Sequence, residues 1–133
     1  MRIKCLQVVT TCSSEAEARR IGRALVEMRL AACAQVGGPV RSTYWWQGKA
    51  EEAAEWVCIL KCTAKRYAEV EAAIKRMHSY TIPEIIAVPV EMGNIEYLKW
   101  LEAETVPAVA AGSPGTGDLS GVKRRQVPGK SAV

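Results

Sequence analysis

The single histidine of the chain, His78, stands in a polar segment together with Tyr80 and Glu84. A neutral imidazole is a good ligand for copper or zinc, and a carboxylate or hydroxyl adds oxygen ligands. The same side chains also suit a structural purpose, because a histidine beside a helix C-terminus is favoured by about 0.3–1 kcal/mol. Glu84 can equally accept backbone N–H bonds within the loop. We leave both interpretations open: a ligand site, or the anchor of a loop.

Lysine and cysteine side chains give a second group of candidates. Lys61 stands in an apolar stretch, where a long cation needs a partner or a route to solvent, so it either binds an anion or extends to the surface. The five cysteines are an odd number and include no C-x-x-C pair. This argues against a disulfide framework and against a zinc ribbon. Most of the thiols are expected to be small buried side chains.

The hydrophobic pattern predicts the elements that position these residues. Alternating apolar residues predict a strand over 3–11. Ser14 and Glu17 have the spacing of a capping box and start a helix that runs to about Arg29. Two further strands, 31–46 and 52–62, are joined by a tight turn at Gln47-Gly48. The remaining elements are a helix that Thr63 caps and His78 closes, a strand from Glu84 to Met92, and a short helix capped by Asn94.

This order, β-α-β-β-α-β with a terminal helix, predicts an α+β protein of the ferredoxin-like split βαβ type, in which one antiparallel sheet carries both helices on one face. The first two strands then run one way and the last two the other. The end of the first strand (residues 10–12), His78 and Glu84 are therefore expected at the same edge. Cys33 is expected at the opposite edge of its own subunit.

The two central strands are predicted to form an unusually long ribbon. Each is well beyond the usual 5–6 residues, and a solvated two-stranded ribbon is marginally stable alone. Its far part is expected to carry Tyr44, Trp45, Trp46 and Trp56. An exposed aromatic patch of this kind favours a subunit interface, in which the ribbon pairs with the sheet edge of a neighbouring copy.

The register of the ribbon decides whether two thiols meet. If Gln47 and Gly48 form a two-residue turn, paired positions place Cys33 opposite Cys62, as two soft donors for Cu(I). A bulge is expected at residues 37–39, where Pro39 removes a ladder donor. A slip of one residue at the bulge would instead send the two thiols to different faces. Both registers remain open.

Charge and composition divide the chain into a domain of residues 1–105 and a tail of residues 106–133. Of the net charge of +4, the tail holds +3, since four basic residues there oppose one acidic residue. This weakens the case for nucleic-acid binding by the folded part. The tail is rich in Gly and Pro and is predicted to be disordered, so truncation after Thr105 is expected to leave the melting temperature unchanged within about two degrees. No membrane span or signal peptide is evident, which predicts a cytoplasmic protein.

Several of these segments together resemble the CutA divalent-cation tolerance family, over about residues 4–102. The matching segments are Leu30-Ala31-Ala32-Cys33-Ala34, Ser42-x-Tyr44-x-Trp46-x-Gly48-Lys49, Glu55, Lys61, His78-x-Tyr80-x-x-Pro83-Glu84-Ile85 and Tyr97-Leu98-x-Trp100. The chain departs from the family pattern at Ser79, where proline is usual, and at Cys62, where threonine is usual.

The resemblance implies a ferredoxin-like subunit in a tight homotrimer, with an architecture similar to PII-type signal proteins. It also implies a part in tolerance of copper or another divalent cation. On this basis Cys33, Cys62 and His78 are candidate metal ligands, while Lys61, Tyr80 and Glu84 are candidates for a small ligand. Because Cys33 and His78 lie at opposite edges of one subunit, a shared site would have to cross a subunit boundary.

The residues bear on three classes of function: a binding protein, an enzyme and an RNA-binding protein. A trimeric cation-responsive binding protein without chemistry of its own is favoured, and a PII-like small-ligand sensor is the alternative. An acylphosphatase-like enzyme lacks support, because the first strand–helix turn has no phosphate-cradling Gly-rich loop and the sequence gives no readable nucleophile–base pair for its one histidine. RNA binding is disfavoured, because residues 3–11 contain no aromatic side chain on which bases could stack.

Overall fold

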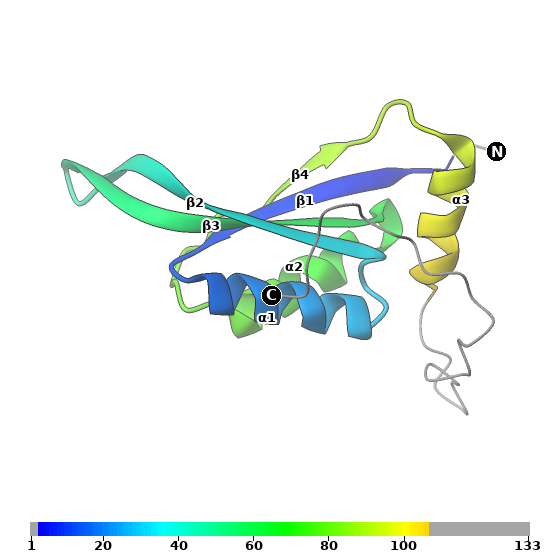
Figure 1. Ribbon diagram of the computed structural model, residues 1–133, viewed down its shortest axis with the longest axis horizontal. Coiled ribbons are helices and arrows are strands. Elements are labelled where there is room, and N and C mark those ends of the chain that lie inside the picture. Colours follow the sequence, from blue (N-terminus) through cyan, green and yellow to red (C-terminus); the bar gives the residue numbers. More distant parts are fainter. Residues whose placement is uncertain (1–2, 107–133) are drawn as a thin grey trace.

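The chain folds in the predicted order of strands and helices. The computed structural model describes residues 3–106, so the predicted tail beyond Val106 lies outside the described residues. The elements, shown in Figure 1, are β1 (Cys5–Cys12), α1 (Glu15–Glu27), β2 (Cys33–Trp46), β3 (Lys49–Thr63), a 3₁₀ turn η1 (Ala64–Arg66), α2 (Tyr67–Met77), β4 (Ile86–Pro89) and α3 (Ile95–Glu104).

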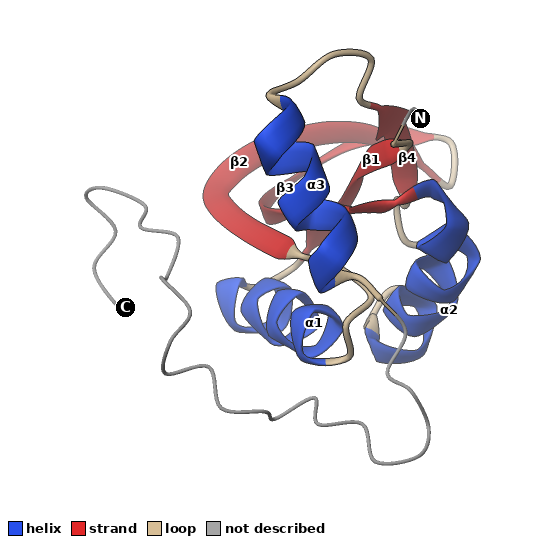
Figure 2. Ribbon diagram, turned by 90° about the vertical axis from the view of Figure 1, so that its right-hand side faces the viewer, coloured by secondary structure: helices blue, strands red, loops and turns tan. Residues whose placement is uncertain are grey.

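The four strands form one antiparallel sheet in the order β2-β3-β1-β4. This is the ferredoxin-like arrangement, and the predicted fold class is confirmed. Helices α1 and α2 lie side by side on one face of the sheet, while α3 crosses its end (Figures 1 and 2). The end of β1 therefore lies close to the start of α1 and the end of α2, the three positions that build the site described below.

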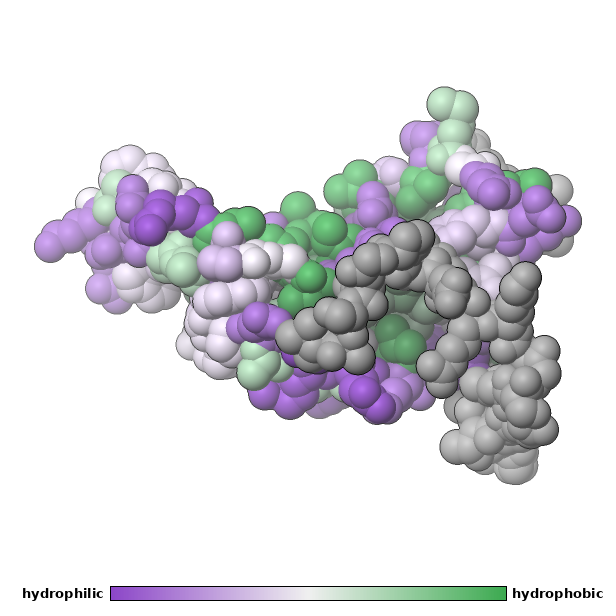
Figure 3. Space-filling model, viewed as in Figure 1, coloured by the Kyte–Doolittle hydropathy of each residue, from purple (hydrophilic) through white to green (hydrophobic). Residues whose placement is uncertain are grey.

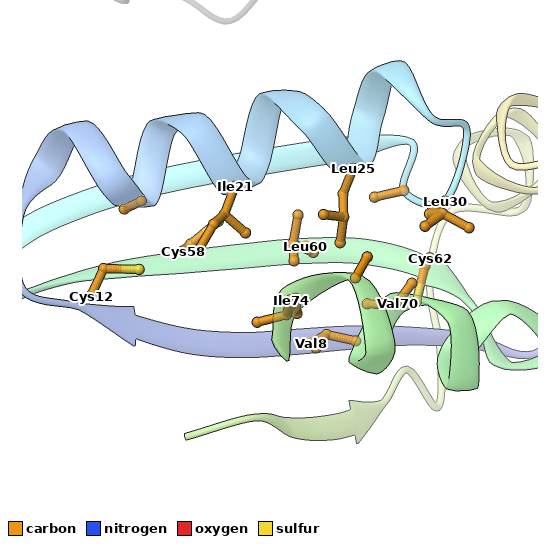
Figure 4. Packing of buried hydrophobic residues seen from close by; sticks show 13 residues of the cluster. Val8, Cys12, Ile21, Leu25, Leu30, Cys58, Leu60, Cys62, Val70 and Ile74 are labelled. Carbon is orange, nitrogen blue, oxygen red and sulfur yellow. The ribbon is translucent and has the colours of Figure 1, made fainter. Parts of the chain in front are cut away.

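The hydrophobic core lies between the sheet and the two helices. Val8, Ile21, Leu25, Leu60 and Ile74 are fully buried and face one another across this layer (Figure 4). Burial of each such side chain contributes about 1.5–3 kcal/mol, so the helix-covered face holds the domain together.

Some element ends differ from the predicted ones. The helix after β3 begins with the 3₁₀ turn, and the Thr63 side chain makes no capping hydrogen bond. The last strand is shorter than the predicted Glu84 to Met92, although the Val90 N–H just beyond it still donates to the Cys5 carbonyl oxygen at 3.0 Å. The predicted cap of α3 is confirmed, since the Asn94 side chain accepts a hydrogen bond from the Glu96 N–H.

The predicted two-residue turn at the ribbon tip is confirmed, and the ribbon is long: β2 has 14 residues and β3 has 15. Gln47 and Gly48 both have positive φ angles, of 51° and 80°, which suits a tight hairpin turn. From the tip down to Val40 opposite Glu55, the pairs follow the predicted register.

The register shifts by one between Gly37 and Val40, so Cys33 lies opposite Lys61. The predicted pairing of Cys33 with Cys62 is therefore wrong, and the alternative of a slip at the bulge holds. Because side chains alternate between the faces of a strand, the slip sends the two thiols to different faces. Cys62 is fully buried beneath the helices, whereas Cys33 is half-buried on the other face.

The face of the sheet away from α1 and α2 exposes apolar side chains. Ile86 and Val88 of β4 are about half exposed, and Figure 3 shows hydrophobic residues at the surface between the ribbon and the α3 end of the molecule. At the ribbon tip, Trp45 and Trp46 are 77% and 52% exposed. Trp56 does not share this position: it pairs with Cys12 of β1 and packs against the core of its own chain.

Candidate functional site

Four chain segments bring a polar cluster together at the end of the sheet. Cys12 ends β1, Glu17 lies in the first turn of α1, His78 caps the C-terminus of α2, and Glu55 lies on β3 at the base of the ribbon. All four residues are buried. The expectation that the end of the first strand and His78 share one edge is confirmed.

Both ring nitrogens of His78 have protein partners. Nε2 lies 2.8 Å from the Thr11 carbonyl oxygen, which can only accept, so Nε2 carries the proton. Nδ1 accepts a hydrogen bond of 3.1 Å from the Tyr80 backbone N–H. These two bonds require the neutral imidazole and one tautomer. The imidazole holds the end of α2 against β1 and fixes the turn that follows it.

Glu17 places a buried carboxylate beside the imidazole. Its Oε2 accepts a 2.7 Å hydrogen bond from the Ser79 N–H and lies 3.7 Å from His78 Nδ1, while Oε1 accepts from the Ser79 hydroxyl at 3.0 Å. Burial alone would raise the pKa of Glu17, but the hydrogen bonds from the Ser79 backbone and side chain and from the Ser13 backbone lower it below its ordinary value. The carboxylate is therefore charged, although it is buried.

Cys12 contributes a thiol to the same cluster. Its Sγ lies 3.7 Å from His78 Nε2, and the residue is fully buried. Burial, followed by the nearby Glu17 carboxylate, raises the pKa of Cys12 to about 12. The thiol is therefore protonated at neutral pH. It is not activated as a nucleophile, because His78 Nε2 carries a proton that it donates to Thr11 and cannot accept one from Cys12.

Tyr80 connects the cluster to the ribbon. Its ring packs against the His78 ring in a tilted arrangement, with a centroid distance of 4.8 Å and an interplanar angle of 44°, and its hydroxyl donates a 2.7 Å hydrogen bond to Glu55 Oε2. Burial and this bond to the Glu55 carboxylate raise the pKa of Tyr80. Glu55 lies directly below the bulge, so one chain of contacts runs from His78 to the base of the ribbon.

The donor atoms of the cluster fit a metal ion of borderline or soft character. A thiol, a carboxylate and an imidazole lie with one ligand atom each within 4.8 Å of one another, in Cys12, Glu17 and His78. Tetrahedral zinc separates a sulfur and a nitrogen ligand by roughly 3.5 Å, and the observed distance from Cys12 Sγ to His78 Nε2 is 3.7 Å. On the same strand, the buried Thr10 hydroxyl makes no hydrogen bond to any described residue.

The structure does not bring the other predicted ligands into this cluster. Cys62 is fully buried within the core. Cys33 lies on the other face of the sheet and pairs with Lys61 of β3. Lys61 pairs with Gln7, near the start of β1, and its Nζ lies 5.9 Å from the centroid of the Tyr97 ring. Glu84 is exposed. Of the six predicted ligand residues, His78 and Tyr80 lie in the cluster.

Sequence reasoning did not recognise Cys12 and Glu17 as candidate ligands. The spacing assigns Glu17 to a capping box, and its N–H donates a hydrogen bond of 3.1 Å to the Ser14 hydroxyl. Its carboxylate instead binds Ser79, 62 residues away. The available signal was the topology, which already placed the end of β1 at the same edge as His78.

Comparison with known proteins agrees with the fold. Residues 6–104 match the family model described as CutA1 divalent ion tolerance protein. The chain belongs to this family. A relative named divalent-cation tolerance protein CutA, from Archaeoglobus fulgidus, is 44% identical over 99 residues, which is 74% of this chain and 95% of the relative.

Solved CutA1 structures share the fold. The divalent cation tolerance protein (Cut A1) of Thermus thermophilus has a TM-score of 0.75 and 41% identity, covering 77% of this chain and 99% of that one. The structure of a CutA from Archaeoglobus fulgidus, described as a periplasmic divalent cation tolerance protein, has a TM-score of 0.74 and 40% identity, with 77% and 99% covered. Across residues 3–106, no helix combines the length and apolar composition needed to cross a membrane.

Proposed function

We propose that this member of the CutA1 family is a homotrimeric, non-catalytic protein that binds copper or another divalent cation at Cys12, Glu17 and His78. The observation that carries the proposal is the convergence of a thiol, a carboxylate and an imidazole from three separate elements. The names of its relatives refer to divalent-cation tolerance, which supports a cation as the ligand.

Each of the three residues would have one task at a bound ion. Cys12 would supply a sulfur ligand after loss of its proton, Glu17 a negative charge, and His78 a nitrogen. The ion would lower the pKa of the thiol, since a coordinating thiol is deprotonated. Metal uptake is therefore expected to release protons and to strengthen as the pH rises.

A binding function without catalysis is supported by the state of the Cys12–His78 pair. A thiol nucleophile requires a lowered pKa or an adjacent base, and neither condition is met here. Burial of Cys12 also keeps a substrate from its sulfur. The cluster is suited to holding an ion rather than to attacking a substrate.

A trimer is supported by the apolar surface that the single chain leaves exposed. Trp45 and Trp46 lie on a ribbon that extends beyond the four-stranded sheet, and Ile86 and Val88 lie on the face away from the helices. An interface built from the ribbon and this face would cover both regions.

Titration of the reduced protein with Cu(I), Cu(II) and Zn(II) tests the metal site. His78→Ala and Cys12→Ser are expected to weaken binding by about 10–100-fold or more. Cys33→Ser is the matched control, because that thiol lies away from the cluster, and its binding is expected to be unchanged. Equal loss with Cys33→Ser would instead favour a site shared between subunits that uses Cys33 and His78.

The PII-like alternative requires a ligand site built between subunits, because Lys61 and Tyr80 lie toward opposite ends of β1 in one chain. Nucleotides added in the same titration test it. The cytoplasmic location stays a prediction from the sequence.

A further inference from the structure

We propose that a cation bound at His78 breaks hydrogen bonds that hold the following turn, at Ser79 and Tyr80, closed. We call this turn the latch. The inference rests on the proposed cation site and adds a coupling between that site and the chain around it. It follows from the fact that the candidate ligands already bind the backbone of this turn.

A bound cation and the Tyr80 N–H must compete for the same nitrogen lone pair of the neutral imidazole. The ring has one nitrogen lone pair, and in this structure the Tyr80 N–H occupies it at Nδ1. If a cation takes Nδ1, it displaces the Tyr80 N–H directly. If it takes Nε2, the ring proton moves to Nδ1, which then cannot accept a hydrogen bond. In both cases the Tyr80 N–H loses its acceptor.

The Glu17 carboxylate strengthens the latch at its first residue. It holds Ser79 by both its N–H and its hydroxyl, at 2.7 and 3.0 Å. A carboxylate oxygen that binds a cation is a weaker acceptor for these bonds, because the cation withdraws its electron density. The two ligands therefore loosen two successive residues of the same turn.

Burial gives the latch a second purpose. Cys12, Glu17 and the His78 side chain are screened from solvent, whereas Ser79 is exposed and lies over them. An ion that enters past Ser79 must open this turn, so the contacts that close the turn also limit entry by that route. The Tyr80 hydroxyl bond to Glu55 carries the same displacement to the base of the ribbon.

Amide hydrogen exchange of the ¹⁵N-labelled, reduced full chain tests the latch, with zinc alone as the probe. At saturating zinc the Tyr80 amide is expected to exchange roughly tenfold faster, as for loss of one hydrogen bond. The Met28 amide, which donates to the Ala24 carbonyl at 2.9 Å at the C-terminal cap of α1, is the internal control and should not change. Zinc uptake with the Tyr80 amide still protected would overturn the latch and leave the cation site standing. No zinc uptake would overturn the latch, and the absence of Cu(I) and Cu(II) binding as well in the titrations above would overturn the cation site.

A pair of variants separates a latch residue from a ligand. Ser79→Ala removes one bond that closes the turn and is expected to tighten zinc binding about threefold to tenfold. Thr81→Ala, on an exposed neighbour in the same loop, should leave zinc affinity unchanged. His78→Ala should weaken it. If Ser79→Ala weakens zinc binding or leaves it unchanged, Ser79 merely organises the site and the latch is wrong.

Discussion

At the scale of single residues, the protein places a charged carboxylate in a buried position and satisfies it with hydrogen bonds. Glu17 is 4% exposed and accepts two bonds from Ser79, beside the neutral ring of His78. A buried charge is tolerated only with such partners. Glu17 therefore belongs both to the candidate site and to the stability of the fold.

Glu17→Gln is expected to lower the free energy of unfolding at pH 7 by about 1–3 kcal/mol, since hydrogen bonds to a charged group are lost. Because the folded-state pKa of Glu17 is lowered, the stabilisation is full above the ordinary carboxyl pKa and disappears as the pH falls through the lowered value. Urea unfolding at pH 7, 5 and 3, at one protomer concentration, should show the variant and wild type converge in acid.

The control for this prediction is Glu27→Gln. Glu27 pairs with Arg23 at 3.0 Å, but both side chains are largely exposed, so the change in the free energy of unfolding should be close to zero at every pH. If Glu17→Gln lowers the free energy of unfolding by the same amount from pH 7 to pH 3, the contribution of Glu17 comes from packing rather than from its charge.

At the scale of elements, the bulge between Gly37 and Val40 decides the geometry of the ribbon. It shifts the β2–β3 register by one residue and so sets which side chains of β2 meet those of β3. Gly38 lies in this bulge with a φ of 146°, a conformation that side-chain-bearing residues rarely adopt. The backbone here also approaches Trp56 closely.

Gly38→Ala is expected to destabilise the protein by about 1–3 kcal/mol because of strain at this φ. Its Cβ would lie 2.9 Å from Trp56 Cδ1 and 3.0 Å from the Glu55 carbonyl oxygen. Gly37→Ala is the matched control: a Cβ there meets no described atom within 4 Å, and the expected change is within about 0.5 kcal/mol. Equal stability of the two variants in thermal unfolding would contradict the role given to Gly38.

At the scale of the whole molecule, the single chain leaves an apolar surface uncovered. The ribbon tip and the sheet face away from the helices together expose Tyr44, Trp45, Trp46, Ile86 and Val88. Two strands of a solvated ribbon gain little stability by themselves. Assembly of copies around this surface would cover it.

Sedimentation is expected to show one species near three times 14.5 kDa, persisting on dilution to nanomolar concentrations. Trp46→Ala should weaken both assembly and thermal stability, because the ribbon tip gains its cover from the neighbouring copy. Met28→Ala, at an exposed apolar residue after α1, is the control and should leave assembly intact. A wild-type monomer that melts cooperatively at low concentration would rule out the trimer.

The sequence by itself determined the order of elements, the caps at Ser14 and Asn94, the two-residue turn at the ribbon tip and the edge at which His78 lies. These depend on local spacing, turn chemistry and the alternation of strands, all of which act over a few residues. Only the tertiary structure decided that Cys33 and Cys62 lie on different faces, because one bulge residue with an unusual φ changes the register. It also decided that Glu17 binds Ser79 and that Cys12 meets His78, 66 residues away. Contacts of this kind depend on how α1 and α2 pack on the sheet, and no local pattern encodes that distance.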